Sequence, residues 1–199
     1  SLQQLQVFQC PSASPDESEV TLPDQGSFTA HYFGVAGPIG TAKNPESSEL
    51  HSYRQIASAP TYGPISLDGL FAPRTNGTFK SHQLRDIKDG FSTPIGFGEI
   101  SSFALEGDDV AQRSGWAFGA GYSSSRKVTR LYGIKSVTRA INSRPKTLND
   151  TPFGSNHPGG AQFSLMDGSV RYIDEKINLD ILKMYASISV GEQVLELNE

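Results

Sequence analysis

The chain has 199 residues, of which 36% are hydrophobic and 19% charged, and its formal net charge is −4. This balance excludes a disordered acidic chain and a bundle of membrane helices. The negative charge argues against nucleic acid or an anionic membrane as a partner, because both require a basic face. With 20 glycines and 12 prolines, the composition favours many turns and short strands. The length suits a single domain over residues 1–199.

Cys10 is the only cysteine, which excludes an intrachain disulfide and a cysteine-rich zinc site. A single cysteine beside a proline is more typical of an inert buried residue than of a nucleophile. No apolar run is long enough to span a membrane, and no signal peptide is visible. Because the chain opens at Ser1 without an initiator methionine, we expect a further segment upstream.

In chain order, short apolar or β-branched runs bounded by Gly or Pro predict strands. These runs are Gln6–Gln9, Ser27–Gly37, Gly69–Pro73, Gly77–Ser81, Ser92–Ser101, Ala161–Met166, Ser169–Ile173 and Gln193–Leu197. The glycines inside Ser92–Ser101 indicate a bulge or a close approach of another backbone. Residues 38–68 are predicted to form a long irregular insertion, and residues 126–150 a loop.

Two segments have helical character. His82–Gly90 can form one or two turns, and Gly90 suits a left-handed C-cap. The second segment begins at Asn178, which can cap it. Its apolar residues recur at helical spacing and are Leu179, Leu182, Tyr185 and Ala186. Strands and helices do not alternate as in a parallel sheet, so we predict an α+β or mostly-β fold with an antiparallel sheet, short helices and long loops.

Asp167-Gly168 separates two of the predicted strands and predicts a hairpin with a two-residue turn in which both residues have positive φ. Phe163, Leu165, Val170 and Tyr172 are expected to fill one or both faces of the hairpin. His157 precedes the hairpin in the stretch HPGGAQFSLMDGSVRYI. The strand runs away from His157 by about 3.3 Å per residue, so we expect His157 and Asp167 to lie roughly 20–30 Å apart. They are therefore no obvious catalytic pair, and we expect His157 to anchor its loop through hydrogen bonds to backbone.

Carboxylates supply the first candidate site. Asp86 and Asp89 share one face of a helical turn, and with Glu99 they would offer oxygen ligands for Ca²⁺. The alternative is a solvated acidic face at a helix end, since the spacing is not that of an EF-hand. Asp108-Asp109 is a similar loop candidate.

Aromatic residues supply the second candidate. Trp116, with Phe118 and Tyr122, would stack on a sugar ring, although such clusters are more often core. The four histidines are scattered singly, so the zinc-hydrolase spacing is absent.

Four stretches together resemble one family, the prepilin-type processing-associated proteins named for a His, nine residues and Asp-Gly. They are VFQCPS at 7–12, LRDIKDGFSTPIGFGE at 84–99, the His157–Ile173 stretch and SVGEQVLEL at 189–197. The positions that match the His-X9-Asp-Gly hallmark are His157, Gly159, Gly160, Asp167 and Gly168. Thr93-Pro94 and Val190 depart from the usual residues, and residues 38–68 and 120–150 match no motif.

The resemblance implies an N-terminal apolar helix, upstream of this sequence, followed by an antiparallel head, as in type IV pilins and type II secretion pseudopilins. It implies cleavage by a prepilin peptidase, anchoring in the inner membrane before processing, and a head exported to the periplasm or cell surface. The implied partners are other pilin-like subunits or secretion machinery. Members often carry a second cysteine in that helix, which would be a partner for Cys10. Some pseudopilin heads bind Ca²⁺, and the family has no established activity.

Three functions remain open. The favoured one is a non-enzymatic, exported pilin-like or pseudopilin-like head. The second is a secreted module that binds a glycan or small solute through residues 115–122 and the long insertion. The third is a metal-dependent hydrolase that uses Asp86, Asp89, Glu99 or His157.

Overall fold

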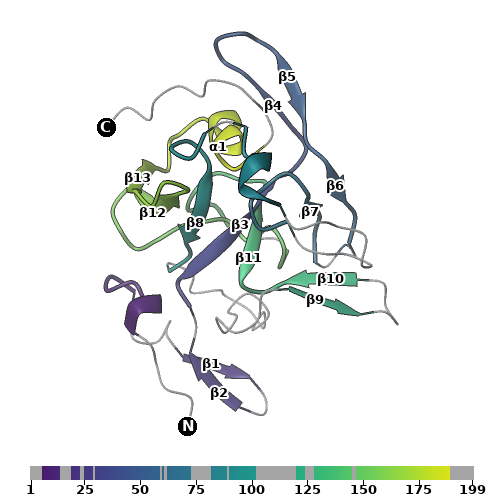
Figure 1. The fold of residues 1–199 in the computed structure, drawn as a ribbon. Helices are drawn as coiled ribbons and strands as arrows, with labels where there is room; N and C mark the ends of the chain where they lie inside the picture. Colours follow the sequence, from purple (N-terminus) through teal and green to yellow (C-terminus); the bar gives the residue numbers. More distant parts are fainter. Residues whose placement is uncertain are drawn as a thin grey trace.

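A five-stranded sheet lies at the centre of the computed structural model (Figure 1). The model describes residues 6–13, 19–22, 25–28, 30–58, 60, 62–72, 82–88, 90–101, 120–123, 128–144 and 147–188. In spatial order the strands of the sheet are β11 (Ile134–Val137), β3 (Tyr32–Pro38), β8 (Ile95–Glu99), β12 (Gly160–Leu165) and β13 (Val170–Asp174). Within the described ranges the fold is thus mostly β, with several sheets and one α-helix, which fits the predicted α+β or mostly-β class.

The direction of β11 corrects the prediction of an antiparallel sheet. β11 lies parallel to β3, whereas the other neighbouring pairs of the sheet are antiparallel. The prediction of a loop over residues 126–150 is also wrong, because it covers β11 and β10 (Val128–Leu131). Strands of four residues are too short to show a clear alternation of apolar and polar residues.

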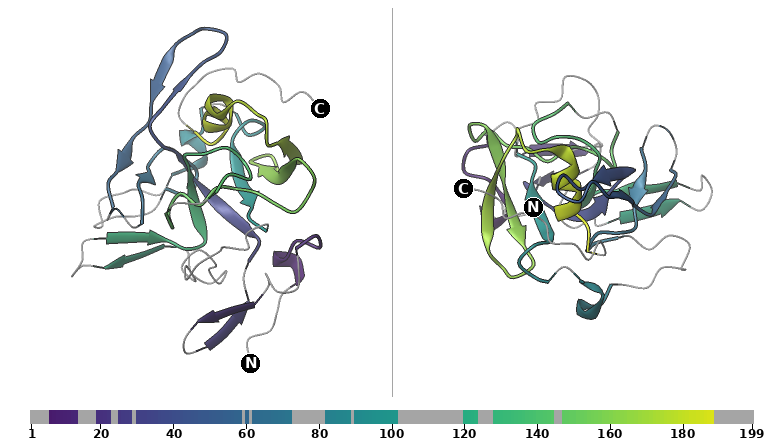
Figure 2. Two further views of the ribbon diagram at one scale, coloured as in Figure 1. Left: turned by 180° about the vertical axis from the view of Figure 1, so that it is seen from behind. Right: turned by 90° about the horizontal axis from the view of Figure 1, so that it is seen from above.

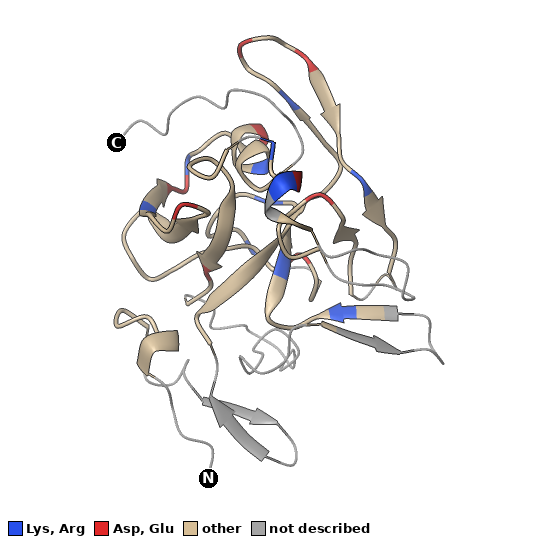
Figure 3. Cartoon of the chain, in the orientation of Figure 1, with Lys and Arg blue, Asp and Glu red and all other residues tan. Residues whose placement is uncertain are grey.

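Among the residues that the structure describes, four two-stranded antiparallel ribbons surround the sheet. They are β1 (Glu19–Leu22) with β2 (Gln25–Phe28), β4 (Thr41–Lys43) with β5 (Leu50–Ser52), β6 (Gln55–Ile56) with β7 (Ile65–Ser66), and β9 (Ala120–Ser123) with β10. The irregular insertion predicted at residues 38–68 therefore contains two ribbons. In Figure 3 the Lys and Arg residues are dispersed over separate elements.

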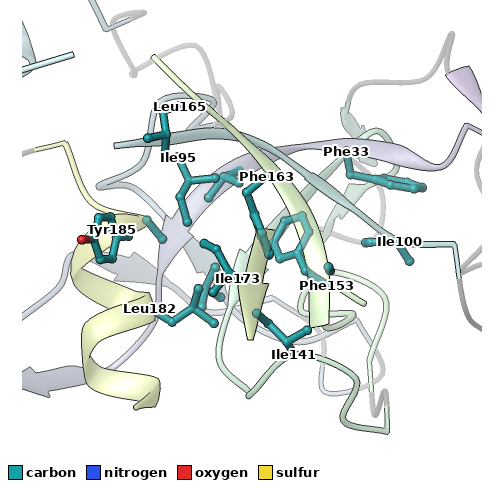
Figure 4. Close-up of a cluster of buried hydrophobic side chains, with 14 residues drawn as sticks. Phe33, Ile95, Ile100, Ile141, Phe153, Phe163, Leu165, Ile173, Leu182 and Tyr185 are labelled. Atoms are coloured by element: carbon teal, nitrogen blue, oxygen red, sulfur yellow. The ribbon is translucent and has the colours of Figure 1, made fainter. Parts of the chain in front are cut away.

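The helix α1 (Leu179–Tyr185) confirms the predicted helix and its cap. The side chain of Asn178 accepts a hydrogen bond from the backbone N–H of Asp180 at 2.8 Å. Leu182, Tyr185 and Ala186 join the main core cluster with residues from the sheet (Figure 4). Met184 packs with Ala42 and Tyr53, so α1 lies between the sheet and the β4–β5 ribbon (Figure 2). No helix within the described ranges has the length and hydrophobicity needed to cross a lipid bilayer.

Of the two alternatives predicted for the glycines of β8, the structure shows the bulge, whereas the groups that approach Gly98 closely are side chains and not another backbone. A Cβ at Gly98 would lie 2.5 Å from Cδ1 of Phe153 and 2.6 Å from Cε1 of Phe163. The two phenyl rings have their centroids 5.5 Å apart and cover the strand at this point. The register between β8 and β12 also shifts between Ser164 and Leu165. Gly98 thus makes room for the centre of the aromatic core.

The predicted hairpin is confirmed as β12–β13, but its turn has three residues. The backbone N–H of Gly168 donates to the carbonyl of Leu165, and that of Leu165 donates to the carbonyl of Ser169. Gly168 has φ +86°, whereas Asp167 is not among the described residues with positive φ. This is the pattern of a type I turn closed by a left-handed glycine. The carboxylate of Asp167 accepts hydrogen bonds from the N–H and hydroxyl of Ser169.

The two strands of the hairpin differ in burial. Phe163 and Leu165 on β12 are buried, as predicted. Val170 and Tyr172 on β13 are 65% and 43% exposed, so the expectation that they fill a packed face is wrong. β13 is one of the two edge strands of the sheet, and one of its faces remains open to solvent.

Three further predictions need correction. Gln6–Gln9 contains the 3₁₀ turn η1 (Gln6–Phe8) instead of a strand, and Val7 is exposed. Residues 69–72 form bends and turns. His82–Gly90 contains only the 3₁₀ turn η3 (Leu84–Asp86), although Gly90 has the predicted positive φ of +77°. The strands predicted at 77–81 and 193–197 lie outside the described residues.

Candidate functional site

Three side chains from distant parts of the chain meet beside one end of β8. Cys10 follows η1, Glu99 is the last residue of β8, and His157 lies in the loop before β12. One ligand atom from each residue lies within 4.8 Å of the other two. In Figure 1 the segment that contains η1 lies below the β8 and β12 strands. This trio is the group of three potential metal ligands found within the described ranges.

Glu99 is held by hydrogen bonds on both carboxylate oxygens. The hydroxyl of Ser101 donates to Oε1 at 2.7 Å, and the backbone N–H of Gln162 donates to Oε2 at 3.1 Å. The residue is fully buried, with 0% exposure. Side chains alternate between faces along a strand, so Glu99 projects away from the face on which the aromatic core covers Gly98. The carboxylate is therefore fixed outside the main core, at the margin of the sheet.

Cys10 is fixed through its backbone. Its N–H donates to Nδ1 of the buried His31 at 2.8 Å, and the N–H of His31 donates to the carbonyl of Phe8 at 2.7 Å. The N–H of Ser12 lies 3.4 Å from Sγ and points to it as a donor. Burial, followed by the hydrogen bond to Glu99, raises the pKa of the Cys10 thiol above its ordinary value. The thiol is consequently a neutral group near pH 7, which does not suit an activated nucleophile.

The Pro-Gly-Gly that follows His157 shapes its loop. Gly159 has φ +80°, a backbone conformation that favours glycine. A Cβ at Gly160 would lie 2.2 Å from the carbonyl oxygen of Ile173, so β12 and β13 can approach only without a side chain there. The hydroxyl of Tyr172 donates to the carbonyl of Pro158. These constraints present the imidazole of His157 to Cys10 and Glu99.

The ring of His157 faces side chains, whereas hydrogen bonds to backbone were expected. Nε2 lies 3.4 Å from Sγ of Cys10 and 3.6 Å from Oε1 of Glu99. Nδ1 lies 3.3 Å from the hydroxyl of Ser12. The side chain of His157 is 29% exposed, so solvent reaches the site from this side.

The arrangement differs from a catalytic triad. In a triad the nucleophile and the carboxylate bind opposite nitrogens of the histidine. Here sulfur and carboxylate both approach Nε2, and one potential ligand atom of each residue lies within 4.8 Å of the other two. That geometry suits binding of a common partner between the three atoms.

The remaining predicted site residues lie elsewhere. Asp86 is exposed on η3, where its carboxylate accepts from the N–H of Gln83, and it is not part of the trio. Asp167 and Gly168 form the turn at the far end of β12, away from the loop of His157. Tyr122 belongs to β9, and its side chain is not described. Asp89, Asp108, Asp109, Trp116 and Phe118 lie outside the described residues.

The sequence did not indicate the joint site because the candidate metal ligands inferred from it include Glu99 and His157 but not Cys10. A single cysteine beside a proline is typical of an inert buried residue, and Glu99 falls among the carboxylates of the calcium candidate with Asp86 and Asp89. The available signal was that Cys10, Glu99 and His157 each lie in one of the stretches on which the family resemblance rests.

The fold and the site thus define a mostly-β protein that carries a Cys–Glu–His cluster at the margin of its sheet. Comparison with known families adds one result: the model of a family described as protein of unknown function (DUF1559) matches residues 1–180. The chain belongs to this family. No curated protein and no solved structure matches it.

Proposed function

We propose that this chain is the head of an exported, non-enzymatic subunit of the pilin or pseudopilin type, as its likeness to the His-X9-Asp-Gly proteins implies. Its localisation would be the periplasm or the cell surface, with anchoring in the inner membrane before processing. Its partners would be other pilin-like subunits or the secretion machinery. Membership of the DUF1559 family is compatible with this proposal.

The observation that supports the proposal best is the meeting of three resemblance stretches at one place. Cys10 comes from VFQCPS, Glu99 ends the stretch over 84–99, and His157 opens the hallmark stretch. Their donor atoms lie within 4.8 Å of one another although Cys10 and His157 are 147 positions apart. Loosely matching motifs that come together in space form one structural unit, and this strengthens a resemblance that no single motif carries.

The geometry of the cluster differs from that of a cysteine hydrolase. Both the thiol and the carboxylate face Nε2 of His157, and the thiol is not activated by the histidine in the manner of a cysteine hydrolase. Calcium is not proposed at Glu99, because sulfur and imidazole donors do not suit a cation that prefers oxygen ligands.

The test is processing of the full-length protein in cells. The complete gene, with a C-terminal epitope tag, is expressed in the parent organism with and without its prepilin peptidase. We expect a leader that is removed only when the peptidase is present, and a mature chain in the envelope fraction. An unrelated secreted protein, processed equally in both strains, is the control. Removal of an ordinary signal peptide in both strains would contradict the proposal.

A further inference from the structure

The donor atoms of Cys10, Glu99 and His157 have the composition of a transition-metal site. A thiolate, an imidazole and a carboxylate are the three ligand types that proteins use for zinc. A site with a thiolate ligand does not favour magnesium or calcium, because both ions select oxygen ligands. We propose that Cys10 Sγ, His157 Nε2 and Glu99 Oε1 bind one zinc ion, with water as the fourth ligand. This inference is independent of the proposed export of the protein.

The spacing of the donor atoms matches the edges of a zinc tetrahedron. Zinc bonds of about 2.3 Å to sulfur and about 2.0–2.1 Å to nitrogen or oxygen place neighbouring donors about 3.3–3.6 Å apart. The Sγ–Nε2 distance is 3.4 Å and the Nε2–Oε1 distance is 3.6 Å. The third pair of donor atoms lies within 4.8 Å, and these two atoms would approach one another when the ion binds. Two of the three donor pairs are thus already at the spacing of a zinc tetrahedron.

Each ligand also has an orienting partner. The hydroxyl of Ser12 contacts Nδ1 of His157 and leaves Nε2 directed to the site. Ser101 and the backbone N–H of Gln162 hold the carboxylate of Glu99. The N–H of Ser12 points to Sγ of Cys10. Metal ligands in proteins are usually oriented by such outer contacts, which fix the ring and raise affinity.

Charge balance also favours a dication. When zinc binds, the Cys10 thiol releases its proton to the buffer and coordinates as a thiolate. The thiolate and the Glu99 carboxylate then neutralise the two positive charges of the ion, in a place where Cys10 is 4% and Glu99 0% exposed. The side chain of His157 is 29% exposed, so solvent would supply the water ligand from this side. Zinc would tie the segment of residues 6–13 to the sheet.

The first experiment titrates the metal-free 199-residue protein with Co²⁺, a spectroscopic substitute for zinc. We expect one ion per chain, a thiolate-to-cobalt charge-transfer band, and loss of this band when Zn²⁺ is added. Because Cys10 is the only cysteine of the chain, such a band can come only from its Sγ. Absence of the band at saturating Co²⁺ would overturn the proposal, as would one ion shared by two chains.

Variants assign the other two ligands. His157→Gln and Glu99→Gln should each weaken zinc binding by at least about tenfold, and Cys10→Ser should abolish the band. The matched controls His82→Gln and Glu46→Gln, which lie outside the trio, should bind like the unmodified protein. Circular dichroism establishes whether each variant folds. If a variant does not fold, the presence or absence of the cobalt band in the unmodified protein still tests the site. Unchanged zinc affinity in folded His157→Gln and Glu99→Gln would place the ion elsewhere and refute the site.

Discussion

The two ends of the His157–Ile173 stretch differ in what holds them. At the Asp167-Gly168 end, the hydrogen bonds that close the turn join residues at most four positions apart, although the N–H of Met166 also donates to the carbonyl of Pro94 on the neighbouring segment. At the His157 end, the ring contacts Cys10 and Glu99, which are 147 and 58 positions away in the sequence. The first end is therefore a product of local chemistry, and the second exists only when the whole sheet is assembled. One motif thus combines a folding signal with a site.

We predict the largest loss of stability for a substitution in the core, between the two ends of this stretch. Phe163 is 1% exposed and packs against Phe153 (Figure 4). Phe163→Ala should lower the free energy of unfolding by about 3–5 kcal/mol, because it removes a large buried ring and leaves a cavity. Val170→Ala on the exposed face of the same hairpin should cost about 0.5 kcal/mol or less. Urea unfolding of both variants measures this contrast, and equal losses would contradict the assignment of inner and outer faces.

A matched pair of glycine substitutions compares the ends directly. Gly160→Ala should cost about 3 kcal/mol, because its Cβ would meet the backbone of Ile173 and force β12 and β13 apart. Gly168→Ala should cost only about 1 kcal/mol, because its Cβ meets no described atom within 4 Å and only the positive φ is unfavourable. Thermal and urea unfolding would show the order. A greater loss for Gly168→Ala would reverse the comparison.

Lys135 on β11 provides a second case of a fully buried polar group. Its Nζ donates to the carbonyls of Leu131 and Leu148, and burial lowers the pKa of Lys135 to about 7. Above that pH the unfolded chain holds more protons than the folded one, so the free energy of unfolding should rise with pH, by at most about 1.4 kcal/mol per pH unit.

The pH effect is measured by urea unfolding between about pH 7 and about pH 8.5, a window below the ordinary lysine pKa. The variant Lys135→Met cannot titrate and should lose this rise, while retaining the rest of the pH profile. Identical profiles for the two proteins would show that Lys135 is not the group responsible.

The smallest predicted effect concerns the cap of α1. Asn178→Ala removes the acceptor for the N–H of Asp180 and should cost about 1 kcal/mol. Asn178→Asp retains an acceptor and should lose much less. The melting temperatures of the two variants measure the contribution of this local contact. Equal decreases in melting temperature would show that the Asn178 side chain does not stabilise the helix as a cap.

Local features of the fold were predictable from the sequence. Asp167-Gly168 between two short runs predicts β12 and β13. The helical spacing of the apolar residues after Asn178 predicts α1. Each of these signals lies within about ten neighbouring residues, where turn chemistry and helical periodicity act. The positive φ of Gly168 was expected for the same reason, although the turn has three residues rather than two.

Long-range features were not predictable in this way. β11 pairs with β3 across about a hundred residues, and no local pattern in Ile134–Val137 specifies a parallel partner. The same holds for the site, because nothing near Cys10 indicates that Glu99 and His157 will face its sulfur. Residue type alone therefore suggested an inert cysteine, and only the folded sheet brings the three donors together.

The most direct test of the account is X-ray absorption spectroscopy at the zinc edge on the zinc-loaded protein. The proposed zinc site predicts one sulfur ligand at about 2.3 Å and nitrogen or oxygen ligands at about 2.0–2.1 Å from the ion. That result would establish that the His157 end of the stretch is a site formed with Cys10. A shell of nitrogen and oxygen without sulfur would contradict this, and the contact between Cys10 and His157 would then be structural packing alone.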